Sequence, residues 1–429
     1  MKTQHPETIC LHAGYDGDPA TRACGVPVYR TAAYHFRDTK HAADLFALKE
    51  PGNIYTRIMN PTQDILEKRM AALEGGAAAL ALASGTSAVY YAVINICRQG
   101  DEIVSSSNLY GGTYTMFDCI LPQFGIKTVF AEPHDPKNFE AAVTDKTKMV
   151  FIETIGNPTL YVPDFAAIAA IAHKRHLPLV VDSTFTPPCV FRPIEHGADV
   201  VVHSLTKWLG GHGAGIGGIV VDAGKFDWTH PNFPLYNEPD PSYHDLRWAR
   251  DLGEGNALAF ITRMRLVPLR NLGACISPDN AWMFLQGIET LPLRMERHCA
   301  NALAVAEYLK SRPSVQWVNY PGLPGDPAHA NASRYFKNGF GGMVVFGIRG
   351  GKEAGAKFIN ALEMFAHLAN VGDAKSLAIH PASTTHSQLS EEQQIAAGVD
   401  PGLIRLSIGI EHIDDILYDI RQALEASQK

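Results

Sequence analysis

Between residues 62 and 221, hydrophobic and polar positions alternate between a helical and a strand pattern. A helix is expected from Asn60-Pro61 to Gly75-Gly76, because apolar side chains recur there at helical spacing and proline and glycine mark its two ends. Further helices are expected at 85–98 and 165–175. Short apolar runs bounded by turn residues predict buried strands at 103–105, 149–152, 179–181 and 200–202. Strands alternating with helices predict an α/β fold with a mostly parallel sheet covered by helices on both faces.

The pattern changes after this region. A long helical stretch is expected at 279–312, and strands are expected at 343–346 and 404–407, which together indicate a smaller C-terminal α/β domain. We therefore predict three parts: an N-terminal arm (1–60), a large domain (61–285) and a C-terminal domain (286–429).

The large domain is expected to contain an insertion at about 222–272. Its segment 226–243 is rich in proline and aromatic residues. Such a segment is either a packed irregular loop or a lid or subunit contact, and the sequence leaves both open.

Composition narrows the class of protein. With 429 residues and 46.7 kDa, the chain is too long for one compact core. Charged residues make up 19%, against roughly 25% in an average soluble domain, which favours a surface partly covered by another subunit. A net charge of −7 gives no basic surface for nucleic acid, and no apolar run is long enough for a membrane span.

The cysteines and the first residues of the chain indicate where in the cell the protein is expected to lie. The seven cysteines are scattered and contain no CxxC pair, so neither a disulfide framework nor a metal site is expected. The start of the chain lacks the charged-then-apolar order of a signal peptide. We therefore expect a cytoplasmic protein with reduced thiols.

Two local motifs match other functions but lack the context that those functions need. The glycines at 213–218 match GxGxxG, yet residues 219–221 predict a strand where a dinucleotide site needs a helix. Ser204 and Lys207 match the SxxK of serine acyl-transfer enzymes, but no KTG follows. Neither function is favoured.

A different set of residues suits one cofactor. Pyridoxal phosphate (PLP) needs a lysine for a Schiff base, an acid for its ring nitrogen and a cup for its phosphate. Lys207 stands beside hydroxyl groups and glycines, Asp182 ends a buried strand, and Ser84-Gly85 begins a helix. Taken singly, Asp182 is equally a cap or turn residue, and Lys207 is equally a surface lysine. Taken together, they indicate a PLP enzyme.

Several longer motifs follow one another in a fixed order. They are Tyr55-Thr56-Arg57-x-x-Asn60-Pro61-Thr62, Ser84-Gly85, Asn108-Leu109-Tyr110-Gly111-Gly112-Thr113, Glu153-Thr154-x-x-Asn157-Pro158, Val181-Asp182-Ser183-Thr184, Ser204-Leu205-Thr206-Lys207 and Arg405-Leu406-Ser407-Ile408-Gly409. On these motifs, nearly the whole chain resembles the Cys/Met-metabolism family of PLP enzymes. The resemblance implies the fold-type I PLP-transferase architecture, with a large sheet domain and a smaller C-terminal α/β domain.

The resemblance also implies a role for each matched residue. Catalysis is implied for Lys207, which would bind the cofactor covalently and then move protons, and for Tyr110, which would stack on the cofactor ring. Cofactor binding is implied for Gly85, Thr86, Asn157, Asp182, Ser204 and Thr206, joined by Tyr55 and Arg57 from the neighbouring subunit. Substrate binding is implied for Arg405, whose planar fork suits a carboxylate, and for Ser383.

Within the family, the chain resembles the O-acetylhomoserine sulfhydrylase branch. The insertion at 222–272 and the segment 370–381 carry this resemblance, whereas Gly112 stands where γ-lyases have a cysteine. The branch implies γ-replacement of O-acetyl-L-homoserine by sulfide or a thiol, in a homotetramer built as a dimer of dimers. A methionine γ-lyase, a cystathionine γ-synthase-like enzyme and a non-enzymatic binding domain on the same fold are the alternatives.

Overall fold

A computed structural model describes residues 3, 5–384 and 400–429. The large sheet has the strand order β1-β7-β6-β5-β4-β2-β3. Its strands are β1 (Ala78–Leu82), β2 (Glu102–Ser106), β3 (Lys127–Ala131), β4 (Thr147–Glu153), β5 (Leu179–Asp182), β6 (Val200–Ser204) and β7 (Gly218–Asp222). The neighbours β3, β2, β4, β5 and β6 run parallel, and β7 runs antiparallel to both β6 and β1. The expected mostly parallel sheet is therefore confirmed.

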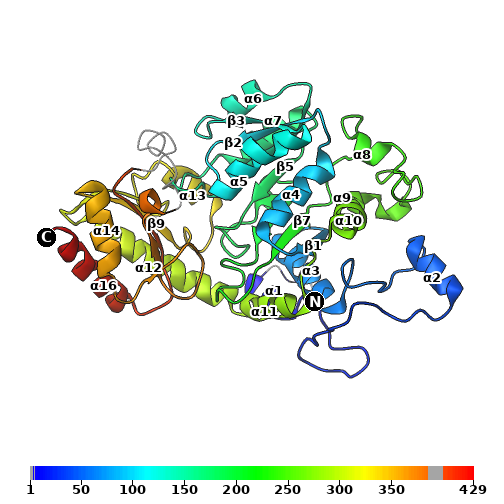
Figure 1. Cartoon of the computed structure of the whole chain (residues 1–429), viewed down its shortest axis with the longest axis horizontal. Helices are drawn as coiled ribbons and strands as arrows, with labels where there is room; N and C mark the ends of the chain where they lie inside the picture. Colours follow the sequence, from blue (N-terminus) through cyan, green and yellow to red (C-terminus); the bar gives the residue numbers. More distant parts are fainter. Residues whose placement is uncertain (1–2, 4, 385–399) are drawn as a thin grey trace.

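Two hydrophobic clusters cover the faces of this sheet. Val181 and Val201 face one cluster and Val180 and Val202 face the other, as the twofold alternation along a strand requires. On the first face pack α1 (Pro6–His12), α3 (Pro61–Glu74), α7 (Phe165–Lys174) and α11 (Pro278–Glu289); on the second pack α4 (Gly85–Ile96) and α9 (Ala259–Met264) (Figure 1). The short helices α5 (Gly111–Thr115), α6 (Lys137–Ala142) and α10 (Arg270–Leu272) lie in the connections. The sheet is thus buried on both faces.

The start of α3 shows why the sequence prediction of its ends held. The Asn60 side chain accepts a hydrogen bond from the Thr62 N–H, Pro61 follows as the first helical residue, and Gly75 closes the helix at a φ of 73°. These are the favoured residues at each position, because the cap supplies a missing acceptor and glycine tolerates left-handed backbone.

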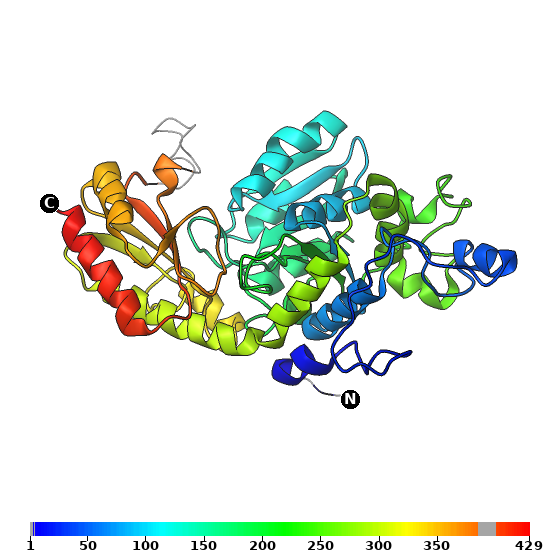
Figure 2. The ribbon, with the colours of Figure 1, turned by 60° about the horizontal axis from the view of Figure 1, so that its bottom comes forward.

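A second sheet, with the order β10-β11-β12-β9-β8, follows in the C-terminal part of the chain. Its strands are β8 (Val315–Asn319), β9 (Met343–Ile348), β10 (Ala366–His367), β11 (Leu377–Ile379) and β12 (Leu403–Ser407). Among the described residues of this part, the helices are α12 (Leu291–Lys310), α13 (His329–Tyr335), α14 (Gly351–Ala361) and α16 (Ile413–Ser427). The two views show this sheet and α16 at the opposite end of the molecule from α2 (Thr39–Phe46) (Figures 1 and 2).

The long helical stretch expected at 279–312 is confirmed, and the structure divides it into two helices, α11 and α12, which meet at Thr290. Pro292 lies in the first turn of α12 and has no N–H to continue the hydrogen bonds of α11. Proline therefore ends one helix and begins the next, although the hydrophobic pattern runs on through the break.

The insertion at 222–272 packs tightly on the large sheet. Trp228, Phe233 and Tyr236 are buried, and the side chain of Asn95 on α4 donates hydrogen bonds to the Tyr236 hydroxyl (2.8 Å) and to the Phe260 carbonyl (3.0 Å). These contacts support the interpretation of the segment 226–243 as a packed loop. The segment includes the short helix α8 (Pro234–Asn237).

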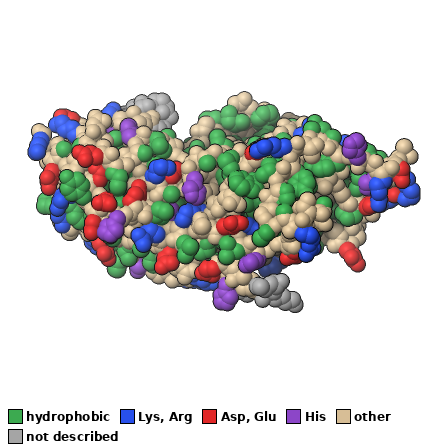
Figure 3. Space-filling view, turned by 90° about the horizontal axis from the view of Figure 1, so that it is seen from below, with side chains coloured by type: hydrophobic (Ala, Val, Ile, Leu, Met, Phe, Trp, Pro, Cys, Tyr) green, Lys and Arg blue, Asp and Glu red, His purple; other side chains and the backbone are tan. Residues whose placement is uncertain are grey.

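The segment that carries α2 lies at one end of the molecule (Figures 1 and 2), where the Phe46 carbonyl accepts a 2.8 Å hydrogen bond from the Tyr243 hydroxyl of the insertion. Several large apolar side chains of the α2 segment are exposed, among them Phe36, Phe46 and Tyr55. Hydrophobic side chains also reach the surface over the middle of the lower face (Figure 3). In the described residues, no helix is both long and apolar enough to cross a membrane.

Candidate functional site

Polar residues end three neighbouring strands at one edge of the large sheet. Glu153 ends β4, Asp182 ends β5, and Ser204 ends β6. Glu153 is paired in register with Asp182, and Asp182 with Val202. The carboxyl ends of parallel strands are where α/β sheets bind ligands. The fold therefore gathers at this edge residues that lie up to 51 positions apart in the chain.

Asp182 is held in a defined position. Its Oδ1 accepts a hydrogen bond from the Thr184 N–H (2.9 Å), and the Thr184 hydroxyl accepts one from the Ser204 N–H (2.9 Å). Burial raises the pKa of Asp182 above its ordinary value, and no ion pair in the described part of the chain neutralises the carboxyl. A buried carboxylate with free acceptor capacity suits a protonated ring nitrogen.

Lys207 lies three residues beyond the end of β6, and its amine meets the C-terminal part of the chain. Lys207 Nζ donates a 2.5 Å hydrogen bond to Asn370 Oδ1. Burial, and next the charge of Arg405, lower the pKa of Lys207 to about 8. An amine with a pKa this low is available as a nucleophile and base near neutral pH.

Arg405 lies in the middle of β12, between Ile379 on β11 and Val345 on β9. Burial lowers the pKa of its guanidinium to about 10. No hydrogen bond or ion pair to this guanidinium occurs among residues 3, 5–384 and 400–429. A half-buried, unpaired guanidinium beside Lys207 is a ready binding group for a carboxylate.

The N-terminus of α4 lies against Ser204. Ser84 caps the helix, and its Oγ accepts a hydrogen bond from the Ser87 N–H (3.0 Å). A Cβ on Gly85 would lie 2.7 Å from the Ser204 Cβ, and a Cβ on Gly218 would lie 2.1 Å from the Ser84 carbonyl oxygen. Only glycine permits this approach, which brings free backbone N–H groups of the helix beside hydroxyl groups, as phosphate binding requires.

Two further predicted cofactor residues complete this cradle. Thr86 is the second residue of α4 and is exposed, and the Thr206 hydroxyl accepts a hydrogen bond from the Gly217 N–H (3.1 Å). The backbone N–H groups and hydroxyl groups gathered here therefore fit the phosphate of a cofactor. Lys207 and Asp182 fit a cofactor that also binds a lysine covalently and pairs with an acid.

Tyr110 and Asn157 lie in the loops that follow β2 and β4. The Tyr110 side chain is 54% exposed, and its backbone N–H donates a 2.7 Å hydrogen bond to Glu153 Oε1. Tyr110 lies close enough to Arg405 to oppose, in small part, the lowering of the Arg405 pKa by burial. Asn157 is half-buried, and in the described ranges its side chain makes no hydrogen bond.

Three predicted residues are not joined to this group by direct contacts in the described structure. Ser383 is exposed, and its hydroxyl bonds to His380 Nδ1 (2.6 Å). Arg57 lies with its guanidinium 5.0 Å from the centre of the Tyr55 ring, and Arg57 Nε is buried without a hydrogen-bond partner. Tyr55 and Arg57 form no hydrogen bond or ion pair with the Lys207 group in the part of the chain that the structure describes.

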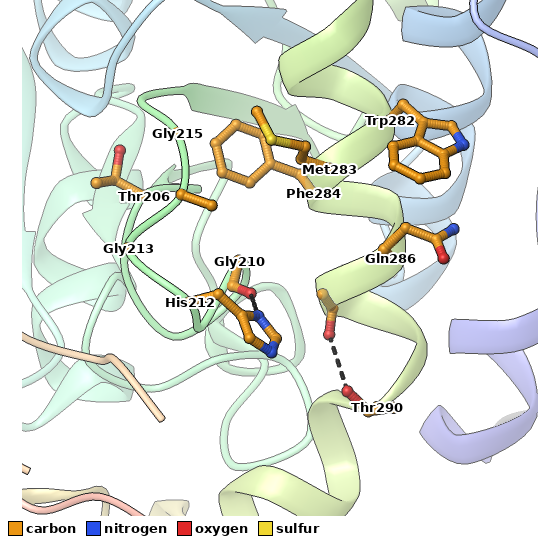
Figure 4. Close-up of a pocket in the computed structure, with 12 residues that line it drawn as sticks. Thr206, Gly210, His212, Gly213, Gly215, Trp282, Met283, Phe284, Gln286 and Thr290 are labelled. Carbon is orange, nitrogen blue, oxygen red and sulfur yellow. Dashed lines mark hydrogen bonds between the residues drawn. The ribbon is translucent and has the colours of Figure 1, made fainter. Parts of the chain in front are cut away.

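A cavity of about 360 Å³ borders the loop that follows Lys207. It lies between the glycine-rich loop 210–215 and α11, with Thr206 at one side and Trp282, Met283 and Gln286 lining the helix side (Figure 4). The space therefore adjoins the predicted phosphate site and has a largely apolar wall.

Sequence reasoning assigned no role to three residues of this group. Asn370 is the hydrogen-bond partner of Lys207, Thr184 connects Asp182 to Ser204, and Glu153 lies beside Asp182. Glu153 was open to detection, because it ends an apolar strand as Asp182 does. Asn370 gave no such signal, since it lies 163 residues from Lys207.

Comparisons with known proteins agree with this geometry. Residues 7–425 match the family model described as Cys/Met metabolism PLP-dependent enzyme. The chain is 55% identical over 98% of its length to the O-acetyl-L-homoserine sulfhydrylase of Leptospira meyeri, covering 96% of that protein. It is 51% identical to the homocysteine synthase of Schizosaccharomyces pombe, with both chains covered completely. A crystal structure from Campylobacter jejuni, with N′-pyridoxyl-lysine-5′-monophosphate at position 205, has 40% identity and a TM-score of 0.93 over 98% of this chain and 99% of that one.

Proposed function

Because the chain belongs to the Cys/Met metabolism family of PLP-dependent enzymes, we propose that it catalyses γ-replacement on O-acetyl-L-homoserine. Sulfide would replace the acetyl ester, giving L-homocysteine and acetate; a thiol in place of sulfide would give a thioether. The observation that carries the proposal is 55% identity, across almost the entire chain, to a protein named O-acetyl-L-homoserine sulfhydrylase. The homocysteine synthase from S. pombe supports the same product.

PLP would be held by the residues at the edge of the large sheet. The proposed set is Lys207 as the covalent attachment, Asp182 at the ring nitrogen, Tyr110 and Asn157 at the ring, and Gly85, Thr86, Ser204 and Thr206 at the phosphate. When bound, PLP supplies an electron sink that allows bonds at the substrate's α, β and γ carbons to break and form. The protein residues supply charge and orientation.

The proposed proton carrier is Lys207. Its pKa of about 8 allows Nζ to accept a proton from the substrate's α carbon and to return it later. Asn370 supports this role because its Oδ1 accepts a hydrogen bond from Lys207 Nζ and so fixes the position of the amine. Asp182, still with free acceptor capacity, would stabilise positive charge on the ring nitrogen.

Arg405 is proposed to bind the substrate carboxylate. Its position on β12 is rigid because strands pair on both sides, and its guanidinium has no partner among the described residues. A bidentate pair with the carboxylate would orient the amino acid and offset the cost of burying the guanidinium. Ser383 is proposed to assist from the short turn Pro381–Ser383 that follows β11.

Capture of PLP by the cofactor-free protein is expected to depend on pH through Lys207. Burial and Arg405 lower the pKa of the amine from 10.5 to about 8, so below that value most of it is protonated and does not attack the aldehyde. The capture rate should rise about tenfold per pH unit and level off above about pH 8. Stopped-flow absorbance measures it, with N-α-acetyl-lysine as the control for titration of PLP itself. A plateau only above pH 10.5 would contradict a lowered pKa.

A substrate panel tests the proposed reaction. O-acetyl-L-homoserine, O-succinyl-L-homoserine and L-methionine are each supplied with and without sulfide, and homocysteine, acetate and 2-oxobutyrate are quantified. We expect homocysteine and acetate in equal amounts, only with O-acetyl-L-homoserine and sulfide. Release of 2-oxobutyrate from methionine would favour a methionine γ-lyase. Both esters are also supplied with L-cysteine, and cystathionine is quantified. Cystathionine formed preferentially from the succinyl ester would favour a cystathionine γ-synthase-like enzyme.

We also propose that each site is shared between two chains of a homotetramer, a dimer of dimers. The extended arm with exposed apolar side chains supports this, because such surface is normally covered. Arg57 is half-buried, and among the described residues its guanidinium forms no hydrogen bond or ion pair, so its exposed part is available to the phosphate site of a partner chain. The cavity beside Thr206 offers space for such a group. A cytoplasmic location is proposed on the seven free cysteines.

A further inference from the structure

Glu153 is a buried acid that the proposed reaction does not use. It ends β4 and is 8% exposed. Its Oε1 accepts the 2.7 Å hydrogen bond from the Tyr110 N–H, and its Cα is paired in register with that of Asp182. Side chains in register on neighbouring parallel strands point to the same face. Two carboxyl groups therefore lie side by side at the edge where the cofactor is proposed to bind.

The two acids differ in their surroundings. Burial first, and next the charge of Asp182, raise the pKa of Glu153 well above its ordinary value, and the Tyr110 N–H opposes this only in part. The groups that face Glu153 are thus Asp182 from β5 and the Tyr110 N–H from the start of α5; no cation in the described chain acts on it. Adjacent buried carboxyl groups do not both ionise readily, and the surroundings of Glu153, which has one backbone donor and a neighbouring carboxyl, disfavour its charged form.

Besides the Glu153 contact, the backbone of Tyr110 is held by α5, where its carbonyl accepts a 2.9 Å hydrogen bond from the Tyr114 N–H. Tyr110 precedes α5, a single turn of five residues that begins without a side-chain cap. Its side chain is 54% exposed. A Cβ on Gly112 would lie 2.6 Å from the Tyr110 Cε1, so the ring leans over a residue without a side chain. The backbone is thus tied at Glu153, and the ring has room only because residue 112 is glycine.

We propose that Glu153 is a positioning residue: by accepting the Tyr110 N–H hydrogen bond beside Asp182, it fixes the Tyr110 ring at the cofactor face of the site. The inference rests on the proposed function, which places Tyr110 against the PLP ring. Glu153 acts as a hydrogen-bond acceptor and not through a negative charge. An amide of the same shape therefore does the same work, and an apolar side chain of the same length does not.

Binding of PLP to cofactor-free protein tests this without any turnover. The dissociation constant and the circular dichroism band of bound PLP are measured for wild type, Glu153→Gln, Glu153→Met, Tyr110→Ala and the double variant Tyr110→Ala/Glu153→Met. We expect Glu153→Gln to bind within about twofold of wild type and Glu153→Met to bind about tenfold more weakly, the size of one lost hydrogen bond. Glu153→Met should also have a weakened dichroism band. The double variant should bind no more weakly than Tyr110→Ala, because Glu153 acts through Tyr110.

Several results would overturn the inference. Glu153→Gln as weak as Glu153→Met would mean that charge matters, and additive losses in the double variant would mean that Glu153 does not act through Tyr110. Unchanged binding in Glu153→Met or in Tyr110→Ala would also overturn it. If Glu153→Met unfolds early in a thermal scan, Glu153→Asp replaces it: its shorter side chain withdraws the acceptor and should weaken PLP binding, and wild-type binding would refute the anchor. Failure of wild type to form homocysteine would refute the proposed function alone.

Discussion

Replacing Lys207 by alanine is expected to abolish turnover while the fold remains. Removing the amine takes away both the covalent attachment of PLP and the proton carrier, and loss of general base catalysis alone costs about 10²–10⁴ in rate. The backbone of the loop is held independently, by the hydrogen bonds from the Lys207 N–H to the Ser204 carbonyl (3.3 Å) and from the Gly211 N–H to the Lys207 carbonyl (2.7 Å). Homocysteine formation, visible absorbance of bound PLP and thermal stability are the measurements.

The control is a lysine that is exposed at the surface and lies outside the candidate site. Lys174 on α7 is 71% exposed and pairs with Glu140 at the surface, so Lys174→Ala should keep full activity. Lys207→Ala should still bind PLP through the phosphate site but release it on gel filtration. Substantial turnover by Lys207→Ala, or loss of its fold, would refute the assignment of Lys207.

Mixing two inactive variants is expected to restore activity to about a quarter of wild type. Arg57→Ala removes the proposed phosphate ligand given to the partner chain, and Lys207→Ala removes the lysine of a chain's own site. With random assembly, about half of the dimers contain one chain of each kind, and each of those has one complete site of two. The homocysteine production of the co-expressed mixture is measured directly. Mixed dimers isolated with two different affinity tags should reach about half of wild-type activity, since each has one complete site of two.

The outcome separates a shared site from a site within one chain. If Arg57 served its own chain, every site in a mixed dimer would lack either Arg57 or Lys207, and the mixture would stay inactive. A matched control is Arg37→Ala, also on the arm, whose guanidinium is exposed and pairs with Glu50. Arg37→Ala should be active alone, because the loss of an exposed pair costs little.

Local elements were readable from the sequence because their causes are local. The ends of α3 follow from Asn60, Pro61 and Gly75, each of which acts within one turn of its own position. The buried strands appeared as short apolar runs because both faces of a parallel sheet are covered. The helical stretch at 279–312 was also readable, but its division into α11 and α12 was not assigned from the sequence, because Pro292 continues the apolar spacing while removing a backbone donor.

The candidate site was readable in part, for the same reason. Asp182 and Lys207 each follow a strand, and Ser84-Gly85 begins a helix, so their positions at the sheet edge were predictable from the elements themselves. Tyr55 and Arg57 were assigned by resemblance, and that assignment stays a prediction until mixed dimers are measured.

Only the tertiary structure decided which of these residues meet. The sequence by itself determined the parallel sheet, the kind of chemistry at its edge and a basic residue at position 405. The pairing of Glu153 with Asp182 comes from the strand order of the large sheet, and the position of Arg405 from the strand order of the second sheet. The contact of Asn370 with Lys207 comes from the placement of the loop between β10 and β11 beside the end of β6. The apolar pattern of a strand records that the strand is buried but not which strand it pairs with. Strand order therefore follows only from the packing of the entire chain.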